Sequence, residues 1–375
     1  MKKIHLVVAP VIGLLVAIGC SQPMPRGAAP QGVAGGPKFV VDPFWPKPLK
    51  GDWIFGQMSG LAVDSRDHVW ILHRPATLAA DEKGAQQKPP LNRCCTPAPA
   101  VMEFDRDGVF VQGWGGPGQG YDWPKSEHGL YVDSEGNVWV AGNDNADHMV
   151  LKFTRDGKFL MQIGKPGKSE GSNSRTQLGR PAHMSVDAAA NELYVADGYA
   201  NRRVAVYDAK TGAYKRHWGA YGAVPSDDKQ EKYSPSAPPS RQFSSPSVHC
   251  VRLSKDGLVY VCDRYNNRIQ VFQKNGTFVK EFFVERETLG AGVTTDLVFS
   301  TDPAQRYLYV ADGPNSQLHI LSRDDGKVLA SFARPGRYAG EFRSLHNLGV
   351  DSNGNLYTAE AGAGRRVQKF VLHAN

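Results

Sequence analysis

Residues 130–141 read LYVDSEGNVWVA, and versions of this phrase recur along the chain. Each version joins two short apolar segments through a turn that contains Asp, Gly or Asn. Alternating apolar residues bounded by such turns are typical of short antiparallel strands. Recurrence of one strand–turn–strand phrase indicates a repeat architecture. Six copies begin at Leu61, Leu130, Met184, Val251, Leu297 and Leu348.

Further strands follow the recurring phrase and complete a larger unit. Four copies are followed by third strands that read RRVAVY, NRIQVF, QLHIL and RRVQKF, and a fourth strand ends in a turn such as KRHWG at 215–219. Four-stranded units of this kind are the blades of a β-propeller. We therefore predict an all-β fold, a six-bladed β-propeller over residues 38–375. The segment Phe39–Val41 is expected to pair with the last blade and close the ring.

Three histidines occupy the same slot in alternate copies, namely His128, His249 and His346. If the copies are blades around an axis, the three side chains converge at the centre. Three imidazoles with an open fourth position are a ligand set of catalytic zinc. Histidine makes up 11 of 375 residues, so three in six slots arise by chance roughly once in a hundred cases, and we predict a metal site. The other slots hold the small residues Ser59, Ala182 and Thr295.

The other histidines do not follow this pattern. His183 lies one residue out of register with the slot, so it is expected to point elsewhere. Surface or loop positions are expected for His73, His148, His217, His319 and His373.

A second set of polar residues follows the second strand of several copies. Arg74 and Arg264 occupy equivalent positions, and copy three continues as DGY at 197–199. These loops should open at one face, near the mouth of the central channel. An arginine there can bind a carboxylate through two hydrogen bonds. The alternative is that Arg264, like Arg202 and Arg268, braces neighbouring blades.

The N-terminal residues resemble a bacterial lipoprotein signal. Lys2 and Lys3 precede an apolar run from Ile4 to Gly19, which is short for a spanning helix, and Cys20 follows small residues. An ordinary signal peptide with a chance cysteine is the alternative. We predict a signal peptide over 1–19, lipidation at Cys20 and a flexible tether over 20–37. The protein is expected to be an exported monomer, held by its lipid at the periplasmic side of the outer membrane.

Two binding functions are not supported by the sequence. Removal of Lys2 and Lys3 would lower the formal charge from +7 to +5, and the remaining surplus is not gathered into blocks. Nucleic-acid binding is therefore not expected. The glycine-rich segment Gly113–Gly120 suggests a phosphate loop, but no helical segment follows it. We interpret it as a turn between blades.

Four cysteines lie beyond the predicted lipidation site. An exported location permits disulfides, but spacing does not fix which cysteines pair. The adjacent pair can bridge, bond elsewhere or stay free. The four are Cys94, Cys95, Cys250 and Cys262.

Three phrases carry a resemblance to a known family: HGLYVD at 128–133, DGYANRRV at 197–204 and VCDRYNNRIQVF at 261–272. They resemble NHL-repeat propellers and, within that group, peptidyl-α-hydroxyglycine α-amidating lyase, over roughly residues 53–372. The resemblance implies a zinc ion held by three histidines, a catalytic tyrosine and two active-site arginines. The matching residues are His128, His249 and His346 for zinc, Tyr199 for the tyrosine, and Arg74 and Arg264 for the arginines.

The resemblance also implies a structural calcium ion, but this chain departs from the family there. The family's aspartate after the last histidine is Asn347, and the backbone carbonyl ligands would lie near Val63 and Leu130. An amide oxygen can still bind calcium. A family cysteine is replaced by Ala200, and one residue is inserted between Pro246 and the second histidine. No copper monooxygenase domain is recognised in the sequence, so nothing in this chain is expected to make the hydroxyglycine substrate.

The chemistry implied by the resemblance is cleavage of a C–N bond. The substrate would be an N-acyl-α-hydroxyglycine or a similar carbinolamide, and the products an amide and glyoxylate. Zinc would act as Lewis acid and template, Tyr199 as general base, and Arg74 and Arg264 as anchors for the carboxylate.

Two other functions stay open at the level of sequence. One is metal-assisted hydrolysis on the same scaffold, and the other is a binding or scaffold role without catalysis, since one fold hosts many functions. The combination of three histidines, a tyrosine and two arginines favours an enzyme. The long insertions at 77–100 and 221–241 are expected to shape the pocket.

Overall fold

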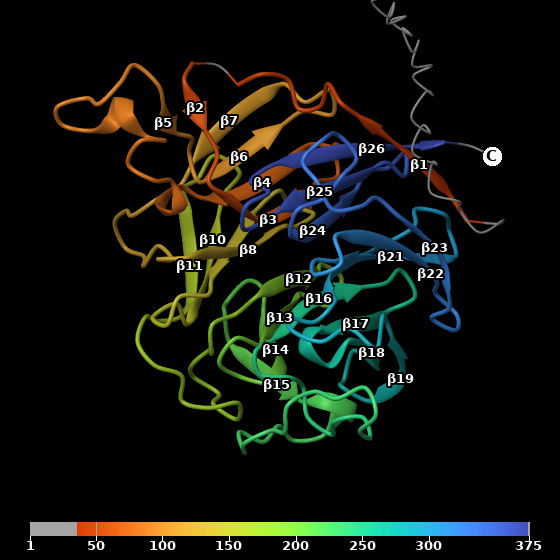
Figure 1. The fold of residues 1–375 in the computed structure, drawn as a ribbon. Coiled ribbons are helices and arrows are strands. Elements are labelled where there is room, and N and C mark those ends of the chain that lie inside the picture. Colours follow the sequence, from red (N-terminus) through yellow and green to blue (C-terminus); the bar gives the residue numbers. More distant parts are fainter. Residues whose placement is uncertain (1–35, 50, 374–375) are drawn as a thin grey trace, which may run out of the picture. The chain divides into compact units, whose positions relative to one another are not determined.

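The computed structural model describes residues 36–49 and 51–373. The predicted signal peptide, Cys20 and most of the predicted tether lie outside these residues. The described residues form six four-stranded antiparallel sheets and one short two-stranded sheet (Figure 1). The predicted all-β, six-bladed propeller is confirmed. No helix in this part of the chain is long and apolar enough to cross a membrane.

Each of the first five blades is formed by consecutive strands, apart from the small β5. Blade 1 contains β3 (Gln57–Val63), β4 (Val69–Arg74), β6 (Val101–Phe104) and β7 (Phe110–Trp114). Blade 2 contains β8 (Glu127–Val132), β9 (Val138–Gly142), β10 (Met149–Phe153) and β11 (Phe159–Gly164). Blade 3 contains β12 (His183–Asp187), β13 (Glu192–Asp197), β14 (Arg203–Asp208) and β15 (Tyr214–Trp218).

The remaining elements follow the same order. Blade 4 contains β16 (Val248–Leu253), β17 (Leu258–Asp263), β18 (Arg268–Gln273) and β19 (Phe278–Phe283). Blade 5 contains β20 (Thr294–Phe299), β21 (Tyr307–Asp312), β22 (Gln317–Ser322) and β23 (Val328–Phe332). Blade 6 contains β24 (Leu345–Val350), β25 (Leu356–Glu360), β26 (Val367–His373) and β1 (Lys38–Asp42). The small sheet pairs β2 (Trp53–Ile54) with β5 (Thr96–Pro97), and the 3-10 turns are η1 (Pro75–Thr77), η2 (Gly84–Gln86), η3 (Ala220–Gly222) and η4 (Arg264–Asn266).

The first and last strands of the propeller close the ring. Strand β1 pairs antiparallel with β26, and Val40 lies opposite Val371. This confirms the predicted pairing and covers an edge that would otherwise expose backbone hydrogen-bonding groups. The first strand of every copy is innermost, and each inner strand packs against the next around the axis: β3, β8, β12, β16, β20 and β24.

The recurring Asp explains why one phrase is repeated in the blades. In blade 2, Asp133 accepts backbone hydrogen bonds within its own turn. Its carboxylate also accepts a hydrogen bond from Trp139 Nε1 at 3.0 Å. Asp64 does the same for Trp70, at 3.1 Å. Each carboxylate therefore fixes the turn between two strands and satisfies a buried indole, a contact worth about 1 kcal/mol.

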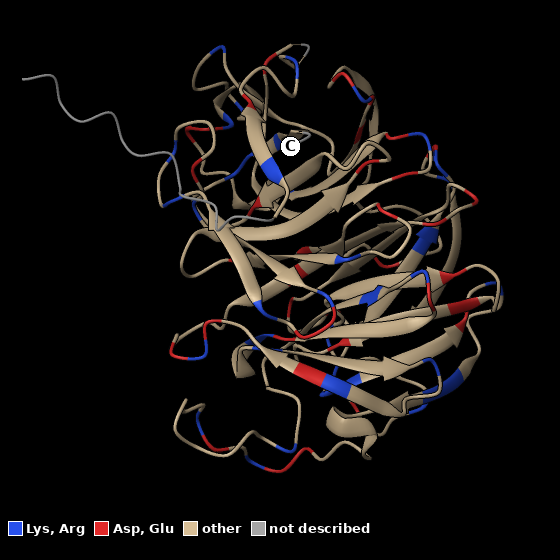
Figure 2. Cartoon of the chain, turned by 90° about the vertical axis from the view of Figure 1, so that its right-hand side faces the viewer, with Lys and Arg blue, Asp and Glu red and all other residues tan. Residues whose placement is uncertain are grey.

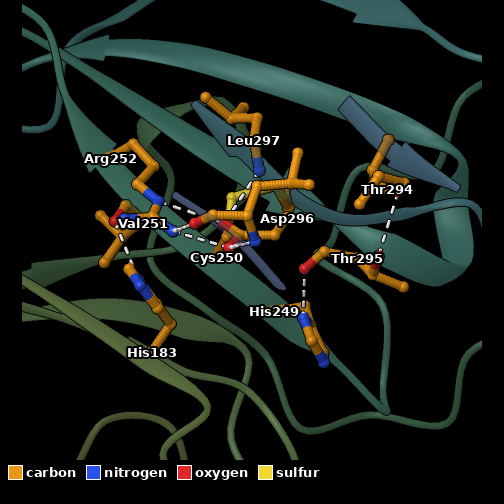
Figure 3. Close-up of a disulfide and its surroundings, with 12 residues drawn as sticks. His183, His249, Cys250, Val251, Arg252, Thr294, Thr295, Asp296 and Leu297 are labelled. Carbon is orange, nitrogen blue, oxygen red and sulfur yellow. Dashed lines mark hydrogen bonds and ion pairs between the residues drawn. A yellow bond between two sulfur atoms is a disulfide. The ribbon is translucent and has the colours of Figure 1, made fainter. Parts of the chain in front are cut away.

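Both disulfides in the described residues join cysteines that are close in sequence. One links Cys250 in β16 to Cys262 in β17. The other links the adjacent residues Cys94 and Cys95, which is one of the three alternatives left open above. The first bridge fastens the strand that carries His249 to its neighbour (Figure 3).

The prediction of surface or loop positions was wrong for His73 and His319, which are buried within strands, whereas His148 lies in a loop as predicted but is also buried. Each of the three rings makes hydrogen bonds in the interior of the propeller. His73 accepts from the backbone N–H of Gly56, and the ring of His148 bonds the carbonyl of Leu178. His319 bonds the carboxylate of Asp312 inside blade 5. Buried polar groups must be paired, so these histidines serve the propeller itself. His217 is half-buried and His373 exposed.

Candidate metal centre

The three slot histidines lie at irregularities of the inner strands. The pairing register shifts between Glu127 and Gly129 in β8, and equivalent shifts surround the other two histidines. The same shift surrounds Ser59 and Thr295 in the slots that carry small residues. A β-bulge turns a side chain away from the regular alternation of a strand. The bulges therefore turn the slot side chains toward the axis.

His128, His249 and His346 come together as the sequence predicts. Their ring centroids are 5.0, 4.8 and 4.8 Å apart, an almost three-fold arrangement. Ring nitrogens from the three residues all lie within 4.8 Å of one another. The rings are buried, with 1, 1 and 8% of each residue exposed. His183 is not a member of the group; its Nδ1 lies 3.1 Å from the carbonyl of Val251 (Figure 3).

Hydrogen bonds at Nδ1 fix which nitrogen of each ring carries the proton. His128 Nδ1 faces the carbonyl of Ala182 at 2.9 Å, and His249 Nδ1 faces that of Thr295 (Figure 3). His346 Nδ1 faces the side-chain oxygen of Asn347 at 2.6 Å. Because an oxygen of this kind only accepts, Nδ1 must be the donor, and Nε2 keeps its lone pair. Metal-binding histidines are oriented in this way in proteins.

Burial keeps all three rings neutral. It lowers the pKa of His128 and His249 well below the usual value, and it lowers the pKa of His346 to about 3. The positive charge of Arg264 adds to the effect on each ring. Neutral imidazole is the form that binds a metal ion.

Tyr199 completes the centre from the loop after β13. A Cβ atom on the preceding Gly198 would lie 2.1 Å from the Val248 carbonyl, so only glycine permits this loop to approach β16. The Tyr199 hydroxyl lies 2.8 Å from His128 Nε2 and 3.1 Å from His249 Nε2. A phenol has one proton and can satisfy only one of two acceptor nitrogens. A cation between these lone pairs would satisfy both, so the donor set fits zinc.

Arg74 lies beside this centre, held by the neighbouring blade. Its Nε donates to the Glu127 carbonyl at 2.6 Å, and its Nη2 donates to the Asn143 side-chain oxygen at 3.2 Å. Its charge contributes to the lowered pKa of His128 and His346, after burial. These bonds orient the guanidinium at the end of β4, next to the histidines.

Arg264 differs from Arg202 and Arg268 in its hydrogen-bond partners. Arg268 is fully buried and bonds Asp263, and Arg202 bonds the carbonyls of Ser226 and Asp228. Both therefore brace the fold. In contrast, the buried Nε of Arg264 has no hydrogen-bond partner in the part of the chain described. An unpaired buried donor beside the histidines is suited to an anionic ligand.

A third arginine near the tyrosine was missed by the sequence reasoning. The Arg180 guanidinium lies 5.7 Å from the centre of the Tyr199 ring and donates to the Asn143 carbonyl. Its φ of 60° is in the left-handed region, which costs a non-glycine residue on the order of 1–3 kcal/mol. Asn143 thus joins Arg180 to Arg74 around Tyr199. The one signal in the sequence is that Asn143, like Arg74, lies where the second strand of its blade ends.

The implied calcium site does not fit the residues present. Asn347 is uncharged, and its side-chain oxygen already accepts from His346. Asn347 lies in β24, and the nearest carboxylate in the neighbouring strand β20 is that of Asp296. This carboxylate is paired with Arg252 at 2.6 Å. Calcium prefers six to eight oxygen ligands that include carboxylates. The carbonyls of Val63 and Leu130 with one neutral amide fall short of that set.

A second cluster of side chains that could bind a metal ion is instead paired with arginines. Asp64, His68 and Glu103 lie close together in blade 1. Arg66 bonds both carboxylates, and Arg155 bonds Glu103 again. Their positive charges neutralise the acidic groups, so we interpret this cluster as an ion-pair network. Figure 2 shows that acidic and basic residues alternate along the strands and loops of the chain.

Comparisons with known proteins agree with this architecture. The sequence profile of the NHL repeat matches residues 247–272. The chain is 30% identical over 278 residues to a peptidyl-α-hydroxyglycine α-amidating lyase of Drosophila melanogaster, covering 67% of this chain and 46% of that protein. It is 27% identical to a peptidyl-glycine α-amidating monooxygenase of Xenopus laevis, covering 84% of this chain and 34% of that protein. The chain thus spans about a third of the length of the monooxygenase.

A solved structure shows the same fold at low sequence identity. The structure of a streptogramin B lyase superposes with a TM-score of 0.52 and 12% identity, covering 89% of this chain and 98% of that chain. At this identity the similarity concerns the fold alone. Together with the repeat match and the relatives, it leads to one conclusion: the chain is an NHL-repeat, six-bladed β-propeller homologous to the peptidyl-α-hydroxyglycine α-amidating lyases.

Proposed function

We propose that this protein is a zinc-dependent carbon–nitrogen lyase that cleaves N-acyl-α-hydroxyglycine-like carbinolamides to an amide and glyoxylate. The observation that carries the proposal is the cluster of three neutral imidazoles, two of which face the Tyr199 hydroxyl through Nε2. Homology to amidating lyases supports the reaction class. His128, His249 and His346 would hold the metal, which would act as Lewis acid on the substrate hydroxyl.

Tyr199 is proposed as the general base of the reaction. The substrate hydroxyl loses its proton, its oxygen forms the new C=O of glyoxylate, and the C–N bond breaks. The departing amide nitrogen gains a proton, so the overall reaction moves one proton from oxygen to nitrogen. The Tyr199 hydroxyl lies between His128 and His249, within hydrogen-bond reach of a group bound at the histidines. A positioned proton carrier of this kind contributes about 10²–10⁴-fold to rate.

The arginines are proposed to anchor the substrate carboxylate. Arg264 offers a buried Nε without a partner in the described chain, and Arg74 is held beside the histidines by Glu127 and Asn143. Charge-assisted, two-point contacts would fix the glycine carbon relative to Tyr199. Arg180 is proposed to position Tyr199 through its contact with the ring.

The test is a metal analysis combined with a product assay. We expect about one zinc per purified mature chain and glyoxylate release from N-benzoyl-α-hydroxyglycine. Zinc without glyoxylate release would keep the site and reject the lyase. A metal-free protein that takes up no added zinc would reject the site itself. The lipid anchor, the exported location and the monomeric state stay predictions.

Replacing Arg264 with alanine is expected to raise KM for the hydroxyglycine about 10–100-fold, because one charged hydrogen-bonded contact to the carboxylate is lost. Arg264→Lys should recover part of this loss, since the charge remains. The exposed Arg306 supplies the control, as Arg306→Ala removes a surface ion pair with Asp302 and a contact with the Tyr307 ring, both outside the histidine centre. Steady-state kinetics decides the matter: an unchanged KM in Arg264→Ala would mean that Arg264 only supports the fold.

A further inference from the structure

A buried ion pair joins two inner strands of the propeller, β16 and β20, close in sequence to the slot histidine His249. Arg252 follows His249 by three residues in β16, about 10 Å further along the strand. Its Nε and Nη2 donate to the two carboxylate oxygens of Asp296 in β20, at 3.1 and 2.6 Å (Figure 3). The side chain of Asp296 is fully buried and that of Arg252 is 13% exposed.

The same pair extends to the strand that carries the third histidine. Arg252 Nη2 also donates to the Leu348 carbonyl at 3.1 Å, and Asp296 accepts the Leu348 N–H at 3.0 Å. The Asn347 side-chain nitrogen lies 3.5 Å from Asp296, while its oxygen accepts from His346 Nδ1. A continuous path of contacts therefore runs from Arg252 to a proposed zinc ligand.

Arg252 also borders a cavity between the inner strands. This cavity of about 260 Å³ is lined by residues of five inner strands. Arg252 is one of these lining residues, so its side chain borders the cavity. The lining residues on the inner strands are Tyr131, Ser185, Arg252, Val298 and Val350.

The charge balance of this region leaves no place for a second cation. Both oxygens of the Asp296 carboxylate accept hydrogen bonds from the Arg252 guanidinium, so the negative charge lies directly against a positive one. Arg252 neutralises that charge directly. A divalent cation bound next to Asn347 would face the guanidinium and find its nearest carboxylate already paired.

We propose that the guanidinium of Arg252 supplies the positive charge that a calcium ion would otherwise supply near Asn347, so that bound calcium is unnecessary in this chain. Through Asp296 and Asn347, Arg252 also positions His346. Only the positioning of His346 rests on the proposed zinc site. The first half concerns the fold and can be tested without any lyase activity.

Calcium is added to the metal-free protein while thermal unfolding is followed. We expect the Tm of the wild-type chain to stay unchanged in CaCl₂. In Arg252→Ala the carboxylate of Asp296 loses its partner, so calcium should raise the Tm by at least about 4 °C. Arg306→Ala is the matched control and should not respond. A calcium-dependent rise of Tm in the wild-type chain would overturn the proposal.

A second variant tests the positioning of His346 and avoids a buried unpaired charge. Arg252→Met combined with Asp296→Asn removes both charges, so this variant should fold and should not respond to calcium. We expect its Kd for zinc, measured by competition with a chromophoric chelator, to rise about tenfold, as for other groups that orient metal ligands. A Kd within twofold of wild type would show that the ion pair does not position His346.

Discussion

Replacing His249 with alanine is expected to remove bound zinc and to lower kcat/KM for glyoxylate release by at least about 10³-fold. Two imidazoles would remain, and a catalytic zinc site needs three protein ligands. The buried ring also hydrogen-bonds the Thr295 carbonyl, so some loss of stability accompanies the loss of metal. Zinc content by mass spectrometry and thermal unfolding on the same sample separate the two effects.

His183 provides the matched control for this experiment. It is as buried as His249, and it bonds a backbone carbonyl through Nδ1, but it lies one residue out of register with the slot. We expect His183→Ala to lose stability while keeping about one zinc per chain. Equal zinc loss in both variants would mean that the histidine cluster does not define the metal site.

Tyr199→Phe is expected to keep zinc and to lower kcat about 10²–10⁴-fold, the usual contribution of a general base. KM should change little, because the proposed carboxylate contacts belong to Arg74 and Arg264. The packing of the ring against His128 and Arg180 stays in the phenylalanine variant. The effect therefore isolates the hydroxyl.

The control for Tyr199 is Tyr207→Phe in β14. The Tyr207 hydroxyl is buried and makes no hydrogen bond in the described part of the protein, so its removal should change neither kcat nor zinc content. If kcat of Tyr199→Phe stays within threefold of wild type, another group must accept the substrate proton.

The blades could be predicted because their determinants are local. Asp133 bonds its own turn and Trp139 six residues later, and such contacts lie within one copy of the phrase. Closure by Phe39–Val41 was also predictable, because one unpaired strand was needed to complete the last blade. The common slot of the three histidines followed from the same periodicity.

Other features depend on which blades face each other and could not be predicted. Arg264 and Arg268 are four residues apart in similar sequence, yet one has an unpaired Nε and the other is tied to Asp263. Arg180 faces the ring of Tyr199 because the Tyr199 N–H bonds the Arg180 carbonyl and brings the two segments together. The burial of His73 likewise depends on an insertion that folds back onto it.

The sequence by itself determined the number of blades, the closing strand and the three histidines at one slot, because a repeat encodes short-range contacts in each copy. The tertiary structure decided which side chains meet on the axis. It turned Nε2 of His128 and His249 toward Tyr199, and it set Arg252 against Asp296 where the family resemblance implied calcium. Those contacts join different blades, and their geometry follows from bulges and side-chain reach that periodicity does not record.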